Sequence, residues 1–457
     1  MQIESKSAES LVLEIEKLLS QGGYQEAVKL CQAINEHHPN LGHGWFLSSC
    51  VAYQLNIMPF ALHSVNQALS LSIDNPNLKI QKAKCLVKMG DMAQALEIID
   101  NLVKHKMLNA ELFNDIALIY NDCHQLNKAC EIFKMAIELS PESSNYYYNL
   151  ASVERYLGLI ESCESNCNLA IKNDLFNFDA HYLRSNLKKQ SLESNHTEQL
   201  NKVLETEIGH PVNYAKIKYA LAKELEDCGK FRKSFEARQE GASAYRKLFN
   251  YNVKADVEFM QNIALTYNQD VFKKEIQGDL GAGLIFILGL PRTGSTLVER
   301  IMSNHSAISS MGELSAFSNI MSEMVSHLAS TKAASVSDMV NLSSQLNFQK
   351  LGQSYMDYIS RIKIDSKYHI DKFPQNSLYI GLIHLALPQA KIILVERDPM
   401  DSCYSIYKEL FTNIYHYSYD LTELAEYYIA HSQLMNHWKK VLPEVVKTVK
   451  YEDLVYN

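Results

Sequence analysis

Residues 283–305 read GLIFILGLPRTGSTLVERIMSNH, and this stretch decides the fold of the second half of the chain. The run GLIFILGL is short, apolar and β-branched in part, which predicts a buried strand. The segment PRTGST is rich in glycine and hydroxyl groups, and Leu297, Ile301 and Met302 follow it at helical spacing. A strand, a loop and a helix of this kind predict an anion site, because the N–H groups of the loop and of the helix N-terminus converge on one point.

The loop differs from the ATP-type phosphate loop at one decisive position. The loop hydroxyls, which are candidate donors to the anion, belong to Thr293, Ser295 and Thr296. Gly289 and Gly294 have the spacing of G-x-x-x-x-G-K-S/T, but Ser295 takes the place of the lysine. A kinase needs that lysine to offset the charge of the β- and γ-phosphates. With Arg292 as the nearby cation, the loop suits a less charged 5′ group, such as one phosphate that bears a sulfonate, and a nucleotide kinase is disfavoured.

Small residues recur every 34 positions in the first half of the chain. The first series consists of Ala27, Ala61, Ala95, Ala129 and Cys163. The second consists of Ser49, Ala83, Ala117 and Ala151, and the third, with two larger members, of Ile34, Ala68, Leu102, Ala136 and Ala170. Turn-prone residues keep the same register at Gly22, Asn56, Gly90, His124 and Gly158. This register predicts stacked helix pairs, because helices cross closely where small side chains meet and each pair needs neighbours to bury its apolar face.

The repeat pattern resembles the tetratricopeptide family and predicts an α-solenoid over residues 1–190. Residues 191–282 are expected to hold an additional helical pair, with its turn at Gly229, and a connector. Residues 283–457 are expected to form an α/β domain with a parallel sheet and a P-loop-like phosphosulfate loop. Repeat arrays present a concave surface that suits peptides or partner proteins, so a peptide or a protein is the expected partner of this array. Homodimerisation stays an alternative use of the array.

The composition limits which binding partners and which cellular compartment are expected. The 457 residues are 47% hydrophobic and 21% charged, and the formal charge of −8 argues against nucleic acid as the main partner. The start MQIESKSAES lacks the features of a signal peptide, and no apolar run approaches the length of a membrane span. The nine cysteines show neither a disulfide framework nor metal-ligand spacing, and Cys85, Cys130 and Cys163 occupy apolar helical positions. These features predict a cytoplasmic protein with no membrane partner and no metal.

Five segments resemble, in order, the motifs of sulfotransferases that use 3′-phosphoadenosine 5′-phosphosulfate (PAPS). They are PRTGSTL at 291–297, MGE at 311–313, HIDKFPQN at 369–376, KIILVERDPMDSCYS at 391–405 and VKYEDLV at 449–455. The first resembles the 5′-phosphosulfate loop, the second the Gly-Glu pair of tyrosylprotein sulfotransferases, the third their lysine motif, and the fourth the strand and loop that grip the 3′-phosphate. Together with the repeats, the chain resembles the tetratricopeptide-repeat sulfotransferase family of the bacterial multi-repeat type, which implies PAPS as the co-substrate.

The resemblance implies roles at the 5′ end of the donor. Glu313 would take the proton of the acceptor, with His305 as the rival base. Lys372 would contact the bridging or sulfonate oxygens and stabilise the departing phosphate. Arg292 would bind the phosphosulfate, together with the loop hydroxyls and the backbone at Gly294.

At the 3′ end, the resemblance assigns the phosphate to Arg397 and Ser405. Arginine matches phosphate with a planar fork of donors, and serine adds a hydroxyl from the following helix. An ion pair between Arg397 and either Asp398 or Asp401 at the strand end is the alternative interpretation. Tyr451 would pack against the nucleotide.

One position departs from the animal protein-tyrosine enzymes, which carry a second arginine where this chain has Glu409. The adjacent Lys408 is the candidate substitute. The family also continues with a helix and a nucleotide-contacting loop beyond VKYEDLVYN, so the α/β domain is expected to be incomplete and this piece weakly active.

The sequence therefore predicts a sulfotransferase that moves a sulfuryl group from PAPS to an acceptor hydroxyl. A protein or peptide tyrosine is one candidate acceptor, and a sugar or a small metabolite stays open. The alternative is a repeat-based interaction or scaffold protein whose sulfotransferase-like domain is catalytically impaired.

Overall fold

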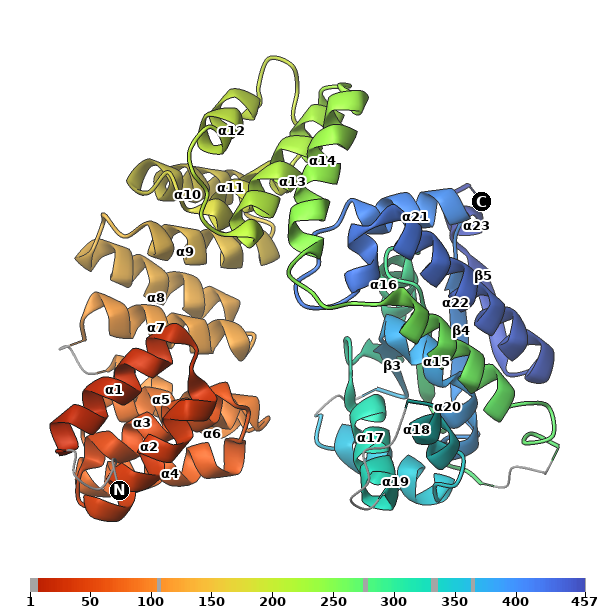
Figure 1. The fold of residues 1–457 in the computed structure, drawn as a ribbon, viewed down its shortest axis with the longest axis horizontal. Coiled ribbons are helices and arrows are strands. Elements are labelled where there is room, and N and C mark those ends of the chain that lie inside the picture. The colour runs from red at the N-terminus through yellow and green to blue at the C-terminus, as the bar shows by residue number, and fades with distance from the viewer. Residues whose placement is uncertain (1–6, 105–107, 274–277, 330–335, 363–365, 457) are drawn as a thin grey trace. The chain divides into compact units, whose positions relative to one another are not determined.

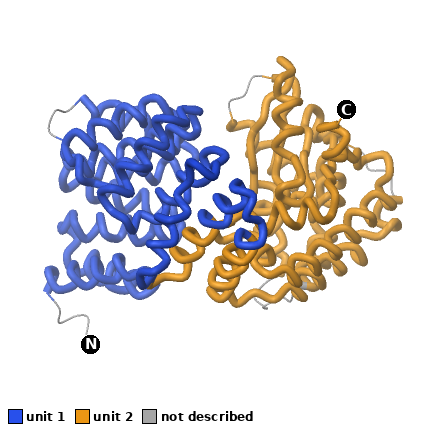
Figure 2. The backbone as a smooth tube through the Cα atoms, turned by 90° about the horizontal axis from the view of Figure 1, so that it is seen from above, with its two compact units in different colours: residues 1–208, 220–234 blue, residues 209–219, 235–457 orange. Residues whose placement is uncertain are grey.

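The computed structural model describes residues 7–104, 108–273, 278–329, 336–362 and 366–456. It divides into two compact units (Figure 2). One unit comprises residues 1–208 and 220–234, and the other comprises residues 209–219 and 235–457. Residues 1–6 and 457, at the two ends of the predicted domains, lie outside the described residues.

Among the described residues of the first unit, five helix pairs follow the predicted register (Figure 1). Their bounds are α1 Ala8–Gln21 and α2 Tyr24–His37, α3 Gly42–Gln54 and α4 Met58–Leu71, α5 Pro76–Lys88 and α6 Met92–Val103, α7 Ala110–Asp122 and α8 Leu126–Leu139, and α9 Ser144–Tyr156 and α10 Ile160–Asn173. Every member of the three small-residue series is buried. The five turn residues of the register all have φ between 58° and 84°, the left-handed conformation that ends a helix and turns the chain sharply. The predicted helical solenoid is confirmed.

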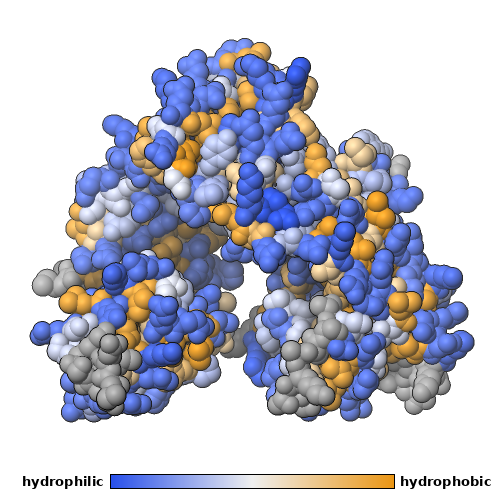
Figure 3. All heavy atoms as spheres, viewed as in Figure 1, coloured by the Kyte–Doolittle hydropathy of each residue, from blue (hydrophilic) through white to orange (hydrophobic). Residues whose placement is uncertain are grey.

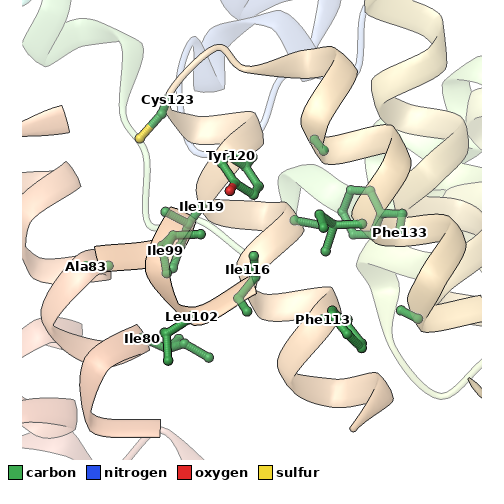
Figure 4. Close-up of a cluster of buried hydrophobic side chains, with 14 of the residues drawn as sticks. Ile80, Ala83, Ile99, Leu102, Phe113, Ile116, Ile119, Tyr120, Cys123 and Phe133 are labelled. Atoms are coloured by element: carbon green, nitrogen blue, oxygen red, sulfur yellow. The ribbon is translucent and has the colours of Figure 1, made fainter. Parts of the chain in front are cut away.

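Stacking of neighbouring pairs builds one continuous core. In the cluster drawn in Figure 4, Ala83, Ile99, Ile116 and Phe133 come from four successive helices, α5 to α8, and all are buried. The predicted burial of Cys85, Cys130 and Cys163 is also confirmed. Each helix pair therefore completes the apolar interior of its neighbours, as expected for a repeat array.

Within residues 174–273, the structure describes five further helices. They are α11 Phe178–Leu187, α12 Thr197–Leu204, α13 Pro211–Asp227, α14 Phe231–Arg246 and α15 Val253–Thr266. Gly229, with φ of 72°, lies at the turn between α13 and α14, where the sequence predicts it.

The described residues of the second unit form a five-stranded sheet, and all its strand pairs are parallel, which confirms the predicted parallel sheet. The strands are β1 Leu284–Gly289, β2 Ile308–Ser310, β3 Tyr368–Lys372, β4 Lys391–Glu396 and β5 Val446–Lys450, in the order β2-β3-β1-β4-β5. The chain visits β2 and β3 on one side of β1 and then β4 and β5 on the other side. In sheets of this kind ligands bind beyond the carboxyl ends of the strands, where the order changes direction.

Helices lie around this sheet (Figure 1), and their bounds follow in chain order. They are α16 Ser295–Ser303, α17 Ala316–Ala329, α18 Val336–Ser343, α19 Phe348–Ile359, η1 Pro374–Tyr379, α20 Ile380–Ala386, α21 Pro399–Tyr407, η2 His416–Tyr419, α22 Leu421–Val441 and α23 Tyr451–Tyr456. The strand β1 is buried along its whole length, as predicted for GLIFILGL. The apolar face expected of α16 differs in part, because Leu297 and Ile301 are exposed, Met302 is partly buried, and Val298 is the buried apolar residue.

The face of the molecule drawn in Figure 3 carries mainly polar side chains. On the face drawn in Figure 3, hydrophilic residues predominate and apolar residues form scattered patches. Of the helices that the structure describes, none combines the length and the apolar character needed to cross a bilayer.

Candidate active site

The loop between β1 and α16 depends on glycine at two positions. Gly289 and Gly294 have φ of 144° and 101°, a region that residues with a Cβ rarely adopt. A Cβ added at Gly294 would lie 2.4 Å from Cδ2 of Tyr451, so the ring of Tyr451 packs directly on the loop backbone. Arg292 also has positive φ, 65°, which is uncommon for a residue other than glycine and occurs often at functional sites.

A cavity of about 550 Å³ opens at this loop. It is lined by eight of the ten predicted site residues, namely Arg292, Gly294, Ser295, Thr296, Glu313, Arg397, Ser405 and Tyr451. The register of the sheet explains the convergence, since Gly289 at the end of β1 pairs with Val395, two residues before Arg397. The loop predicted to bind the 5′-phosphosulfate and the segment predicted to bind the 3′-phosphate therefore share one cavity.

The two remaining predicted residues do not line that cavity. The hydroxyl of Thr293 is buried and donates to the carbonyl of Leu290 at 2.8 Å, so it closes the loop from inside. Lys372 ends β3 and is also buried, but its ammonium group reaches the carboxylate of Glu313 at the cavity wall.

Arg397 connects the two predicted halves of the site. Its guanidinium lies over the ring of Tyr451, 4.6 Å from the centroid, and Nη1 donates to the carbonyl oxygen of Arg292 at 3.3 Å. Nη2 lies 3.6 Å from the carboxylate of Asp401, so the strand-end ion pair is present with that residue, whereas Asp398 caps α21 instead. Nε is buried and has no hydrogen-bond partner among the described residues, which leaves a donor for an anion.

Glu409 lies beside the loop arginine. Its carboxylate is 3.6 Å from Nη1 of Arg292, and both side chains are substantially exposed, so solvent weakens this pair. Lys408, the candidate substitute, places its ammonium 5.1 Å from the ring centroid of Tyr404 and is not among the residues that line the cavity. His305, the rival base, is exposed and accepts the N–H of Ala307 at its Nδ1, and it does not line the cavity either.

Sequence reasoning missed Glu299, which lies on α16 five residues after Gly294. Its carboxylate is 3.9 Å from the ammonium of Lys372 and accepts a hydrogen bond from Ser310. A glutamate on a short helix normally reads as a solvated surface residue. Its partners Ser310 and Lys372 lie in β2 and β3, and no sequence pattern within α16 predicts these contacts.

Sequence reasoning also missed Asp371, which precedes Lys372 in β3 and points to the opposite face of the sheet. Burial raises the pKa of this carboxyl to about 7, although hydrogen bonds from the Tyr355 hydroxyl and the Leu314 N–H oppose the shift. Since Leu314 follows Glu313, Asp371 anchors the segment that carries the predicted base.

The cavity that Glu313 lines also has an aromatic wall. Phe411, Ile414 and Tyr415 belong to this wall, and the rings of Phe411 and Tyr415 meet edge to face with their centroids 4.9 Å apart. Asn413 and Tyr415 have φ of 59° and 55°, so this segment holds two residues in the left-handed conformation. Burial, and then the charge of Glu313, raise the pKa of the Tyr415 hydroxyl. The aromatic density of the segment FTNIYHYSY is the signal that could have identified this wall.

The polar groups of the cavity suit an anion. Guanidinium groups, loop hydroxyls and the N-terminus of α16 meet there, and these are the donors that bind phosphate and sulfonate oxygens. Across the residues that the structure describes, no group of three His, Cys, Asp or Glu side chains is arranged to hold a metal ion.

Comparison with family models matches both parts of the chain. Residues 285–457 match the model of the sulfotransferase family. Residues 58–153 match the model of the Psidin N-terminal TPR repeats region.

Individual proteins are also similar to parts of this chain. An uncharacterized protein of Aquifex aeolicus (strain VF5) is 25% identical over 269 residues, which are 56% of this chain and 35% of that protein. The interferon-induced protein with tetratricopeptide repeats 2 of Cricetulus griseus is 26% identical over 137 residues, 28% of each chain. This chain thus covers about a third of the length of these curated relatives. A thermophilic TPR protein of Thermus thermophilus, a solved structure, has a TM-score of 0.36 and 14% identity, and the similarity covers 40% of this chain and 98% of that one.

Proposed function

Because the chain joins a tetratricopeptide-repeat region to a domain of the sulfotransferase family, we propose that it transfers the sulfuryl group of PAPS to an acceptor hydroxyl. The observation that carries the proposal is the shared cavity, in which Arg292, Glu313, Arg397 and Ser405 meet although the first and the last are more than 100 residues apart in the chain. A cavity of about 550 Å³ lies within the range of small-molecule sites.

The donor fits these residues by charge and by shape. Arg292, Ser295 and the N-terminus of α16 would hold the 5′-phosphosulfate at the loop. Arg397, with a buried Nε that lacks a partner in the described part of the chain, and Ser405 would hold the 3′-phosphate. A triphosphate is a poorer match, because Ser295 stands where a triphosphate loop requires lysine.

The chemical step assigns one role to each charged group. The acceptor oxygen attacks the sulfur of the donor, its proton passes to Glu313, and the bond between sulfur and the bridging oxygen breaks. The electron pair of that bond goes to the 5′-phosphate, whose added negative charge Lys372 and Arg292 would neutralise. The products are the sulfated acceptor and 3′-phosphoadenosine 5′-phosphate (PAP).

We favour a peptide or protein tyrosine as the acceptor. The aromatic wall of Phe411 and Tyr415 lines the same cavity as Glu313, and a phenol ring packed on this wall would present its hydroxyl to the carboxylate. The repeat array would supply the surface that holds the surrounding peptide. All nine cysteines are free, which fits a reducing compartment such as the cytoplasm.

Calorimetry with PAP, AMP and ATP tests the donor. PAP should bind at least about tenfold more tightly than AMP, because the 3′-phosphate adds charged hydrogen bonds worth about 1.5–3 kcal/mol. Equal affinities for the three nucleotides would refute the assignment of Arg397 and Ser405. Failure to bind any of them would favour the repeat-based interaction protein instead.

Transfer of radiolabelled sulfate from PAPS to a pool of tyrosine-containing peptides tests the base. Glu313→Gln should lower turnover by about 10²–10⁴-fold, the usual contribution of a general base. Glu323→Gln is the matched control, since Glu323 is a largely exposed glutamate on α17. Full turnover in Glu313→Gln would move the base to another group, with His305 the first to examine.

A further inference from the structure

Lys372 is held between two carboxylates. Its ammonium is hydrogen-bonded to Glu313 and lies 3.9 Å from Oε2 of Glu299. The lysine side chain is 8% exposed and that of Glu299 is 12% exposed, whereas that of Glu313 is 52% exposed. One carboxylate of the pair therefore faces the cavity and the other is enclosed by protein.

Glu299 is fixed more firmly than a surface glutamate. The hydroxyl of Ser310 donates to it, and the N–H of Gly312 donates to Ser310 Oγ at 2.9 Å. The N–H of Lys372 in turn donates to the carbonyl of Gly312 at 3.0 Å. These contacts join α16, the end of β2 and the end of β3 in one network, so the distance between Glu299 and Lys372 is set by backbone as well as by charge.

The contact between Lys372 and Glu313 competes with the transfer step. The carboxylate oxygen that accepts a hydrogen bond from the ammonium is the oxygen that the acceptor hydroxyl would have to reach. Each N–H that Lys372 donates to a carboxylate is also one that it cannot donate to the bridging oxygen of the donor. The proposed reaction therefore requires Lys372 to leave Glu313 when the donor arrives.

We propose that Glu299 is a positioning residue that keeps the ammonium of Lys372 in place while Lys372 exchanges Glu313 for the donor. The proposal rests on the proposed function. Glu299 touches neither donor nor acceptor, and it acts through Lys372 alone. Its enclosed carboxylate is the permanent counter-ion of the lysine, so that the exposed carboxylate of Glu313 is released for proton transfer.

Glu299→Gln tests this role with little change of shape, since the amide oxygen still accepts the Ser310 hydrogen bond. Without its second counter-ion, Lys372 should stay on Glu313, and turnover should fall about 10–100-fold, the scale of a misplacement of about 1 Å at a reacting centre. The affinity for PAP should stay within about threefold of the wild type, so that the loss appears in kcat. Glu299→Asp, which keeps the charge, should recover part of the loss.

Ser310→Ala gives a second, milder test. It removes the donor that orients Glu299 and also the acceptor of the Gly312 N–H, while both carboxylates and the lysine remain in the chain. Turnover should fall about threefold, which is the effect expected from one lost hydrogen bond. If Glu299→Gln does not fold, wild-type turnover in Ser310→Ala overturns the proposal. Glu323→Gln serves again as the control and should match the wild type.

The structure of the full chain with PAP bound supplies a readout that needs no acceptor. The proposal expects the Lys372 ammonium to lie within hydrogen-bond distance of Glu299, with its contact to Glu313 broken. Lys372 still bonded to Glu313, or wild-type kcat in Glu299→Gln, would overturn the inference while PAP binding upholds the proposed function. Absence of PAP binding would overturn the proposed function first and the inference with it.

Discussion

The repeat array and the α/β unit use small residues in opposite ways. In the array, Ala95 and Ala129 are equivalent positions of one register, and both are completely buried where helices cross. In the α/β unit, Gly289 and Gly294 are each used once, to let backbone approach a strand carbonyl and a tyrosine ring. The array repeats one solution to a packing problem, whereas the loop uses each glycine for one local geometry.

This difference separates stability from function. A change at a register position of the array alters the packing of one helix pair and its neighbours. A change at a loop glycine alters the cavity, because the same backbone that glycine permits also forms the wall of the site. The following predictions test that separation, beginning with the largest expected effect.

Gly294→Val should abolish measurable PAP binding. The new side chain would overlap the ring of Tyr451 and would have to adopt φ of 101°, a strained conformation. A loss of about 100-fold or more, about 3 kcal/mol, is expected in calorimetry.

Gly158→Ala is the matched control in the array, because Gly158 also has positive φ but an added Cβ meets nothing within 4 Å. It should cost about 1 kcal/mol of stability and leave PAP affinity unchanged. PAP binding by Gly294→Val at wild-type affinity would contradict the geometry of the loop.

Buried carboxylates also distinguish the two units. Burial acts to raise the pKa of Glu224 in the first unit, but hydrogen bonds from His196 and Ser185 outweigh it and hold that pKa below the ordinary value. Burial prevails at Asp371 in the second unit, where the pKa rises to about 7. Hydrogen bonds thus outweigh burial at Glu224 in the first unit, while the sheet next to Lys372 keeps a carboxyl that titrates near neutral pH.

Asp371→Asn should remove a pH dependence from the stability of the α/β unit. The folded protein keeps the Asp371 proton up to about pH 7, whereas the unfolded chain loses it near the ordinary value of 3.8. Stability contributed by this group is therefore present at low pH, falls as the pH rises from about 4 to about 7, and is constant above that. The loss should amount to about 4 kcal/mol, since each pKa unit of the shift corresponds to about 1.4 kcal/mol. Asparagine does not titrate and should lack this slope.

Urea unfolding measures this effect. Trp438 is buried in the α/β unit, and its fluorescence reports that unit when Trp45 is replaced by phenylalanine. The difference in unfolding free energy between Asp371→Asn and the parent should change steadily between pH 5 and pH 7. Parallel curves for the two proteins would show that Asp371 ionises normally. Tyr355→Phe, which removes one hydrogen bond to Asp371, should leave the direction of the slope unchanged.

The sequence predicted those features that repeat or that occupy one continuous motif. The register of Ala27 and Ala61 is visible because it recurs, and the loop at Gly294 is visible because strand, turn and helix are contiguous. The sequence could not reveal Glu299, whose importance depends on Lys372, 73 residues further along the chain. The apolar spacing of α16 misled for a related reason, since Leu297 lines the cavity and is exposed there.

The smallest expected effect concerns packing alone. Ala95→Leu inserts three carbon atoms at a position of α6 that is completely buried. Overpacking of this kind typically costs about 1–3 kcal/mol. Ala93→Leu makes the same change two residues earlier on the same helix at an exposed position, so it should be within about 0.5 kcal/mol of the wild type. Thermal unfolding followed by circular dichroism should separate the two variants, while both bind PAP equally.

If Ala93→Leu destabilised the protein as much as Ala95→Leu, the buried register would not be what holds the helix pairs together. A weakened PAP affinity in Ala95→Leu would show instead that packing in the array reaches the cavity, and the separation of stability from function would fail.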